Sequence, residues 1–544
     1  MDKVKLLGGK CTSTSALAAP RLKHLTLRHM RVLEEWVENS TTTPNSFPFL
    51  EELIVEECSM LRIAPSDFPA VKEIKLNCVG KEGLSSLLSQ PSSLTSLEKF
   101  HIKNCPKLSL NLTSSFHSLK EIYIYKIGGL DMMCSSANND PRRHHLPSLT
   151  SLYVGGVPEF TALPKGFLQS SSSEYLQSVS IWNCDKFHGF VDVEGSELPL
   201  LFSSNLKRIK VVLCRNLESI NVRGLTSLET LEITECSWSR GLESSIIGLQ
   251  SLQALKNLTL DGVPIIMLSG EDAISDGCGW PHLEILKIRR SRNVTLTASQ
   301  LPSLRVMQIY FIRNVVIEPI TNDDILPSLT DLKISGLFPE GQGLLQSCSK
   351  SLKKLHIIDC DNFQGFTQHE LQLFTSLKEL RIRNCSSLTS LELSSMVSLT
   401  ELEIINCKGI KSFSFSSEDL QDIPSLRRLS IGGFSEEQDH LPFLPLEDSD
   451  SPWCSSLEAL AIQGWDKITS LPHHLQHLTA LRHLQIWRFD SLVALPEWLG
   501  NLSSLHSLTI SSCRGLMHLP SKQQFTTTHF AGFGVDFGLS PFVG

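Results

Sequence analysis

The sequence contains no run of about 18 consecutive apolar residues, the minimum for a helix that crosses a bilayer. Its first residues carry no apolar stretch of the length of a secretory signal peptide. Acidic residues number 57 against 49 basic ones, so the excess of positive charge typical of a nucleic-acid binder is missing too. We therefore expect an intracellular protein, in the cytoplasm or alternatively the nucleus, that binds neither membranes nor nucleic acid.

Catalytic signatures are missing as well. There is no Gly-x-Ser-x-Gly, and the zincin-like start His369-Glu370 has Leu373 where a second histidine would be needed. His473, His474 and His477 lie close together, but a metal site needs further ligands in a defined geometry. We expect no enzymatic activity, no cofactor and no metal.

The sequence is instead dominated by one short apolar pattern that recurs. In its clearest copy apolar residues fall at Leu377, Leu380, Ile382 and Leu388, with a cysteine at Cys385. The first apolar position recurs twenty times between residues 22 and 505, with a mean step of about 25 residues. These positions are Leu22, Leu50, Val71, Leu97, Leu119, Leu149, Leu176, Leu206, Leu228, Leu255, Leu283, Leu304, Leu329, Leu352, Leu377, Leu399, Leu426, Leu457, Leu481 and Leu505.

Each copy predicts a short strand followed by a turn. Leu380 and Ile382 are two residues apart and therefore share one face, while Arg381 between them points to the other. At the turn a small buried side chain, Asn or Cys, is expected to stack on its neighbours. One copy cannot bury its own apolar face, but stacked copies can.

Nine of the fifteen cysteines occupy this turn position. Each belongs to a different copy, so we expect reduced, buried thiols rather than a disulfide framework. They are Cys58, Cys105, Cys184, Cys214, Cys236, Cys360, Cys385, Cys407 and Cys513.

The core Leu-x-x-Leu-x-Leu-x-x-Cys is similar to the leucine-rich-repeat signature. This resemblance implies an α/β fold, a right-handed horseshoe-shaped solenoid of about twenty repeats. Its concave side would be one parallel β-sheet, and its convex side irregular or built of short helices. We expect a lead-in over residues 1–20, the repeats over 21–520, and a tail or cap over 521–544.

Four copies share the sequence Ile-x-Asn-Cys, at Ile102, Ile181, Ile382 and Ile404, and a Leu-Pro pair recurs at Leu471, Leu495 and Leu519. Together these resemble the repeat region of plant intracellular disease-resistance receptors, the coiled-coil type of nucleotide-binding leucine-rich-repeat proteins. The resemblance implies a protein partner, either a pathogen effector or a modified host protein. It also implies contact with a nucleotide-binding module, in cis or in trans.

That module is not in this sequence, because no Gly-x-x-x-x-Gly-Lys-[Ser/Thr] is present and Gly8-Gly9-Lys10 lacks the first glycine. The chain is then a fragment, a truncated product or a repeat-only relative. The alternative function is the substrate-binding repeat domain of an F-box-type ubiquitin ligase, although residues 1–20 are too short for an F-box.

The register also predicts which side chains the concave sheet presents. Large aromatics and a row of basic residues between the eleventh and fifteenth copies are the candidates for protein binding, because such residues are favoured at interfaces. The alternative is that the basic residues only solvate the sheet. The candidates are Tyr123, Tyr125, Tyr153, Trp182, Lys287, Arg289, Tyr310, Lys333, His356, Arg381, Arg383 and Trp487.

Overall fold

The computed structural model describes most of the repeat region, and it divides the chain into two compact units. The first unit comprises Met1–Ile266 and Gly270–Leu283, and the second comprises Met267–Ser269 and Glu284–Gly544. The described residues are 3–7, 21–37, 47–90, 93–111, 116–133, 146–163, 175–190, 205–238, 245–263, 265–268, 279–297, 300–312, 314–318, 326–336, 343–348, 350–366, 373–391, 396–410, 424–434, 455–465 and 468–520. The predicted tail, residues 521–544, lies outside them, as does His369-Glu370.

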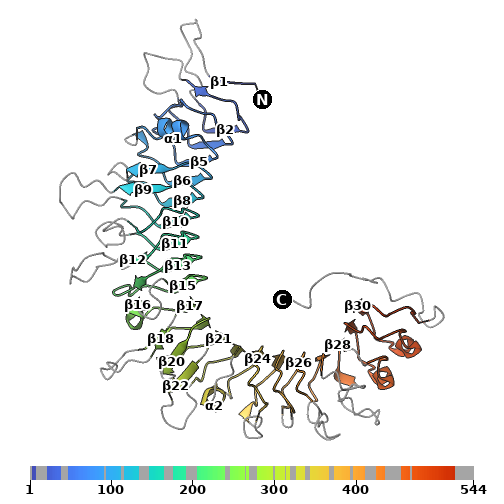
Figure 1. Cartoon of the computed structure of the whole chain (residues 1–544). Coiled ribbons are helices and arrows are strands. Elements are labelled where there is room, and N and C mark those ends of the chain that lie inside the picture. The colour runs from blue at the N-terminus through green and yellow to red at the C-terminus, as the bar shows by residue number, and fades with distance from the viewer. Residues whose placement is uncertain are drawn as a thin grey trace. The chain divides into compact units, whose positions relative to one another are not determined.

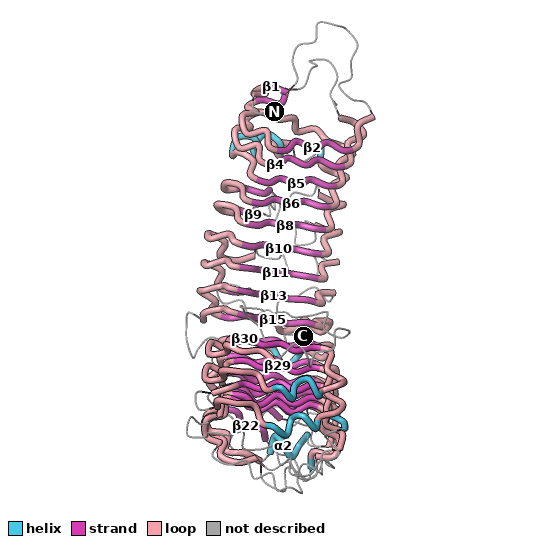
Figure 2. Tube along the Cα trace, turned by 90° about the vertical axis from the view of Figure 1, so that its right-hand side faces the viewer, coloured by secondary structure: helices cyan, strands magenta, loops and turns pink. Residues whose placement is uncertain are grey.

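A strand occurs in each of the twenty predicted copies, and within each unit the strands pair in parallel in sequence order (Figures 1 and 2). The first unit holds β2 (His24–Arg28), β4 (Glu52–Glu56), β5 (Glu73–Asn77), β6 (Lys99–Lys103), β8 (Glu121–Tyr125), β10 (Ser151–Gly155), β11 (Ser178–Trp182), β13 (Arg208–Val212), β15 (Thr230–Thr234) and β17 (Asn257–Asp261). The second holds β19 (Ile285–Arg289), β21 (Val306–Tyr310), β23 (Asp331–Ser335), β24 (Lys354–Ile358), β25 (Glu379–Arg383), β26 (Glu401–Ile405), β27 (Arg428–Gly432), β28 (Ala459–Gln463), β29 (His483–Trp487) and β30 (Ser507–Ser511).

The predicted inward positions form the core. Leu380 and Ile382 of β25 are fully buried, and each pairs in register with the equivalent Leu and Ile of β24 and β26. Leu377, before the strand, and Leu388, after the turn, are fully buried too. The strand register read from the sequence is therefore confirmed, and the fold is a parallel β-solenoid.

Every main strand except β28 is followed by a residue with left-handed backbone geometry. Asn384 follows β25 with φ of 53°, and Asn406 follows β26 with φ of 56°. Asparagine tolerates this conformation better than most residues. The Asn384 side chain is exposed and donates to Asp359 Oδ1 at 2.7 Å. The prediction that asparagine is the buried turn residue is therefore wrong, because its backbone, not its side chain, makes the turn.

Cysteine fills the buried place one residue later. Cys407 is fully buried, and its thiol donates to the carbonyl oxygens of Ile405 at 3.6 Å and of Ile382, one repeat earlier, at 3.9 Å. The nine turn cysteines are free thiols. Eight are buried as predicted; Cys513, in the last described repeat, is only partly buried.

The side opposite the main sheet contains more strand than predicted. In the first unit the short strands β7 (Leu108–Asn111) and β9 (Leu130–Met133) pair with each other, and β14 (Ser219–Asn221) pairs with β12 (Gly189–Phe190) and β16 (Ser245–Ile247). In the second unit β20 (Asn293–Thr297) pairs with β22 (Asn314–Glu318). Figure 1 shows β7 and β9 across the coil from β6 and β8. These segments pair because consecutive repeats are in register there as well.

The remaining elements are short. A two-residue strand, β1 (Leu6–Leu7), lies in the predicted lead-in and pairs with β3 (Glu35–Trp36). β18 (Ile265–Leu268) falls where the units divide. The described helices are α1 (Lys81–Leu87), α2 (Gly343–Cys348), η3 (Leu249–Ser251), η5 (His473–His477) and η6 (Glu497–Asn501).

Candidate functional site

The outward faces of the main strands carry the predicted binding residues, and the structure separates these residues into groups with different surroundings. Every strand places its first, third and fifth residues outward, because the second and fourth enter the core. Tyr123, Tyr125, Tyr153 and Trp182 belong to the first unit, on β8, β10 and β11. The basic candidates, Tyr310 and Trp487 belong to the second unit.

The four aromatics of the first unit form one aromatic cluster. Tyr123 and Tyr153 stack with their ring centroids 4.4 Å apart and their planes at 3°. Tyr125 and Trp182 stack at 5.7 Å and 16°, although they lie on strands separated by β10. They meet because the residue between them in register is Gly155, which has no side chain.

Tyr153 occupies the space over that glycine. A Cβ built on Gly155 would lie 2.9 Å from both Cε1 and Oη of Tyr153, so the ring fits only because residue 155 is glycine. Burial, together with the neighbouring Tyr123, raises the pKa of Tyr153 well above its ordinary value. The Tyr153 hydroxyl therefore stays protonated and takes part in the packing of the cluster.

Two lysines lie against the cluster. The ammonium group of Lys103 is 4.9 Å from the centroid of the Tyr123 ring, and that of Lys126 is 5.3 Å from the centroid of Tyr125. His101 meets Tyr123 edge-on and contacts Glu121 at 3.1 Å. Among the described residues no carboxylate pairs with Lys103 or Lys126, so both lysines keep an uncompensated charge beside the rings.

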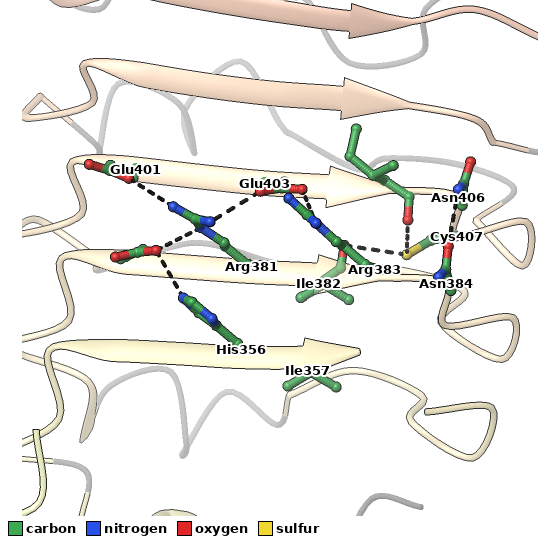
Figure 3. Close-up of polar contacts among 12 residues, drawn as sticks. His356, Ile357, Arg381, Ile382, Arg383, Asn384, Glu401, Glu403, Asn406 and Cys407 are labelled. Carbon is green, nitrogen blue, oxygen red and sulfur yellow. Dashed lines mark hydrogen bonds and ion pairs between the residues drawn. The ribbon is translucent and has the colours of Figure 1, made fainter. Parts of the chain in front are cut away.

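In the second unit, half of the predicted basic row is neutralised by its own neighbours (Figure 3). Glu379 receives His356 Nε2 at 2.9 Å and Arg381 Nε at 2.6 Å. Arg381 also reaches Glu401 at 3.5 Å, and Arg383 pairs with Glu403. Because β24, β25 and β26 are adjacent, these residues form one closed charge network rather than a positive surface.

The network is largely removed from solvent. The side chains of His356 and Glu379 are only 8% and 9% exposed. The hydrogen bond from His356, with the charges of Arg381 and Lys354, lowers the pKa of Glu379 from 4.5 to about 2. The carboxylate is therefore ionised at neutral pH, and the network holds β24, β25 and β26 together rather than offering free charges to a ligand.

The other half of the row differs. Lys287, on β19, and Lys333, on β23, form no ion pair with any described residue, and β21 between them presents the neutral Gln308. Arg289 lies 4.9 Å over the ring of Tyr310 and likewise has no described carboxylate partner. Lys287, Arg289, Tyr310 and Lys333 are called the cationic patch below.

One aromatic at this patch was missed by the sequence reading. Phe311 directly follows Tyr310, is 56% exposed and has φ of 52°. A bulky residue in this conformation is unusual and costs about 1–2 kcal/mol. The signal in the sequence is an aromatic at a position where several other copies have Asn or Gly.

The remaining candidates are isolated. Trp487 ends β29 between Gln463 and Ser511, without a described aromatic neighbour. His473 and His477 bound the short helix η5, away from the sheet, and the described residues contain no group of three or more metal-ligating side chains. None of the helices in the described part of the chain has the length and hydropathy of a membrane span.

The stacked strand and turn, with Leu and Ile inward and Cys behind the turn, define a leucine-rich-repeat solenoid. No protein family matches the sequence, and no curated protein does. Solved structures do match: a circular leucine-rich-repeat protein, CroV588, is similar with a TM-score of 0.48 at 13% identity over 90% of this chain and 76% of that one. A TDR receptor gives 0.39 at 15% over 93% of both chains. The plant peptide hormone receptor RGFR1, in complex with RGF2, gives 0.31 at 14% over 92% and 91%. At these values the ligands of those proteins say nothing about this chain.

Proposed function

We propose that the chain is a protein-recognition module that binds its partner through the outward faces of its parallel strands. The observation that carries this proposal is the placement of Tyr, Trp and Arg at outward strand positions, where Tyr125, Trp182 and Tyr310 are half-buried and Arg289 is exposed. These residue types dominate the binding energy of protein interfaces, and a bare sheet gains nothing from presenting them to water.

The narrower proposal is a plant disease-resistance receptor that senses a pathogen effector or a modified host protein in the cytoplasm. It is supported by the Ile-x-Asn-Cys copies, in which Asn takes the left-handed turn and Cys the buried place. It is also supported by the Leu-Pro series, since Pro472 and Pro496 directly precede η5 and η6. In this proposal a nucleotide-binding module acts with the repeats, in cis or in trans.

Within the second unit the cationic patch is the better binding candidate. Arg381 and Arg383 already have carboxylate partners. A ligand that replaced those partners would lose about as much binding free energy from the broken ion pairs as it gained from the new ones. Lys287 and Lys333 lack partners among the described residues and can attract an acidic protein surface. Tyr310, held by Arg289, supplies the apolar anchor.

The test begins with a pairwise binding screen of the chain against cloned pathogen effectors and host defence proteins. Any binder is then measured again with the variant Lys287→Glu/Lys333→Glu. The matched control is Lys353→Glu/Lys378→Glu, which changes the charge equally on exposed residues just before β24 and β25. Thermal melts verify that both variants fold.

We expect the patch variant to weaken binding by about tenfold or more and the control by much less. Recovery of a ubiquitin-ligase adaptor as the main binder would favour the alternative function. Equal loss in both variants would show that only net charge matters, and would contradict the assignment of binding to this patch.

A further inference from the structure

The aromatic cluster of the first unit has the features of a ligand site that is formed before any ligand arrives. Tyr125 and Trp182 contact each other across Gly155, and Tyr153 packs over Gly155 and stacks on Tyr123. Four large side chains thus hold one another in place. A partner that docks on them loses little further side-chain entropy, which is why rigid Tyr and Trp residues make efficient binding surfaces.

The way the rings pack determines what they can offer. Tyr123 and Tyr153 stack between the adjacent strands β8 and β10, and Tyr125 and Trp182 stack across β10, so the ring faces point along the sheet toward each other. The ring edges, which carry partial positive charge, are left for the solvent side. A nucleic-acid base that stacks needs an open ring face, so this arrangement disfavours single-stranded RNA. An aromatic side chain can instead meet the ring edges with its negatively charged face.

The charges at the cluster also favour a ligand that does not stack on the rings. Lys103 and Lys126 lie against Tyr123 and Tyr125, and neither has a carboxylate partner among the described residues. The nearby Glu121 is engaged by His101. Positive ring edges and the ammonium groups of Lys103 and Lys126 therefore lie beside an apolar centre, which fits a ligand that brings carboxylates together with an apolar side chain.

The dimensions fit an extended peptide. Lys103 lies on β6 and Trp182 on β11, with β8 and β10 between them in the ladder. Three strand spacings amount to about 14 Å, which an extended chain covers with about four or five residues. An extended segment laid across the strands would reach both lysines and the rings.

We propose that the aromatic cluster, with Lys103 and Lys126, is a binding site for an extended acidic segment of a partner protein that places an aromatic side chain against the rings. This inference rests on the proposed function, because it takes the partner to be a protein. It goes beyond that function by assigning a second site, in the other unit from the cationic patch, and by naming the chemistry of its ligand.

The test uses short synthetic peptides and the purified full chain, with affinity measured by fluorescence anisotropy. One peptide is rich in Glu and Asp around a central Trp; matched peptides replace the acids with Gln or Lys, or the Trp with Ala. A single-stranded oligonucleotide is included as a competitor. We expect binding of the acidic Trp peptide alone, weakened by salt, without competition from the oligonucleotide.

Variants of the protein locate the site. Trp182→Ala should weaken the acidic peptide about tenfold or more, and Trp182→Phe, which keeps a ring, should weaken it less. Lys103→Gln/Lys126→Gln should weaken it and reduce the salt dependence. The matched control is Lys210→Gln on β13, because Lys210 already pairs with Glu232 at 3.0 Å and should not contribute.

The sharpest variant is Gly155→Ala. It removes no aromatic residue, but its Cβ would displace the Tyr153 ring. Since the atoms it meets are the far end of one side chain, folding should be preserved while the packed cluster is disturbed. We expect this variant to bind the acidic peptide about tenfold more weakly with an unchanged melting temperature.

The inference is overturned if the Gln or Lys peptides bind as well as the acidic one, if no peptide binds, if the oligonucleotide competes, or if Gly155→Ala and Trp182→Ala bind like the wild type. A protein partner that still depends on Lys287 and Lys333 would then leave the proposed function standing. If no peptide binds and no protein partner is found, both the proposed peptide site and the proposed function are rejected.

Discussion

Replacing Glu379 with Gln should destabilise the middle of the second unit by about 3 kcal/mol at pH 7. The carboxylate accepts from His356 at 2.9 Å and from Arg381 at 2.6 Å, with Lys354 at 3.3 Å. Its pKa falls from 4.5 to about 2, and each pKa unit corresponds to about 1.4 kcal/mol. Gln has the shape of the protonated acid, so the variant loses about that whole difference.

The sign of the pH dependence follows from the lowered pKa. The folded-state value, about 2, lies below the ordinary value of 4.5, so the carboxylate's contribution is fully present above pH 4.5 and is lost as the pH falls toward 2. The Gln variant has no such group. The difference between wild type and variant should therefore shrink from about 3 kcal/mol at pH 7 to about half that at pH 3.

Hydrogen exchange read by mass spectrometry suits this measurement, because a repeat protein opens locally rather than in one step. The free energy of opening is compared for peptides that cover β24 to β26, with peptides from β29 and β30 as internal reference. The control variant is Glu458→Gln, whose carboxyl group pairs with Arg427 at 2.8 Å but is 40% exposed. If Glu379→Gln has no larger effect than this control, or the same effect at pH 3 as at pH 7, the reasoning is refuted.

Other predictions concern the core, the thiols and the turn. Leu380→Ala empties a fully buried position shared with two neighbouring strands and should cost about 2–5 kcal/mol in the same exchange assay; no loss would contradict the packing. Among the nine turn cysteines only Cys513 should react rapidly with a thiol reagent in the native protein, since it is only partly buried and the other eight are buried; rapid labelling of the others would contradict their burial. Phe311→Asn should raise the stability by about 1 kcal/mol in thermal or urea unfolding, because Asn384 occupies the same left-handed position without difficulty; a lower stability would show that the Phe311 ring packs favourably.

The main sheet was predictable from the sequence because one pattern determines each strand. In every copy two apolar residues at a spacing of two must face inward, and the following strand must pair in register for either to be buried. Leu380 and Ile382 illustrate this, since both are fully buried between equivalent residues. The second, shorter strands were not predicted, because β7 and β9 lack a shared sequence signature.

Some buried positions escaped the sequence reading because their residue type varies. Phe374 lies three residues before Leu377, is 1% exposed and accepts the Leu377 N–H at 3.4 Å in the turn that leads into β25. The equivalent residues are Trp280 before β19 and Met396 before β26. In these three repeats the position is filled by three different residue types, so the sequence pattern does not reveal it.

The charge of the outward face could not be read from one strand at a time. Arg381 and Arg383 have the same residue type as Arg289, and only the register shows that Glu401 and Glu403 of the next repeat pair with them. The aromatic cluster likewise depends on Gly155, whose role becomes visible only when β8, β10 and β11 are aligned. The pairing of charges and the packing of the rings could therefore not be predicted without knowing the neighbours from other repeats.

Ion pairs between neighbouring repeats recur in the described part of the chain. The residue that precedes each of the first strands of the first unit takes part in such ion pairs. Glu51 is bound by Lys23 at 3.0 Å and by Lys72 at 2.9 Å, and Glu98 is bound by Lys120 at 2.9 Å. Residues one strand apart are close enough for any outward cation to be matched by an acid in the next repeat. The sequence uses this option repeatedly, yet beside Lys287 it presents Gln308 instead of an acid. In the proposed function the partner would supply the carboxylate at this place, and the variant Lys287→Glu/Lys333→Glu tests whether it does.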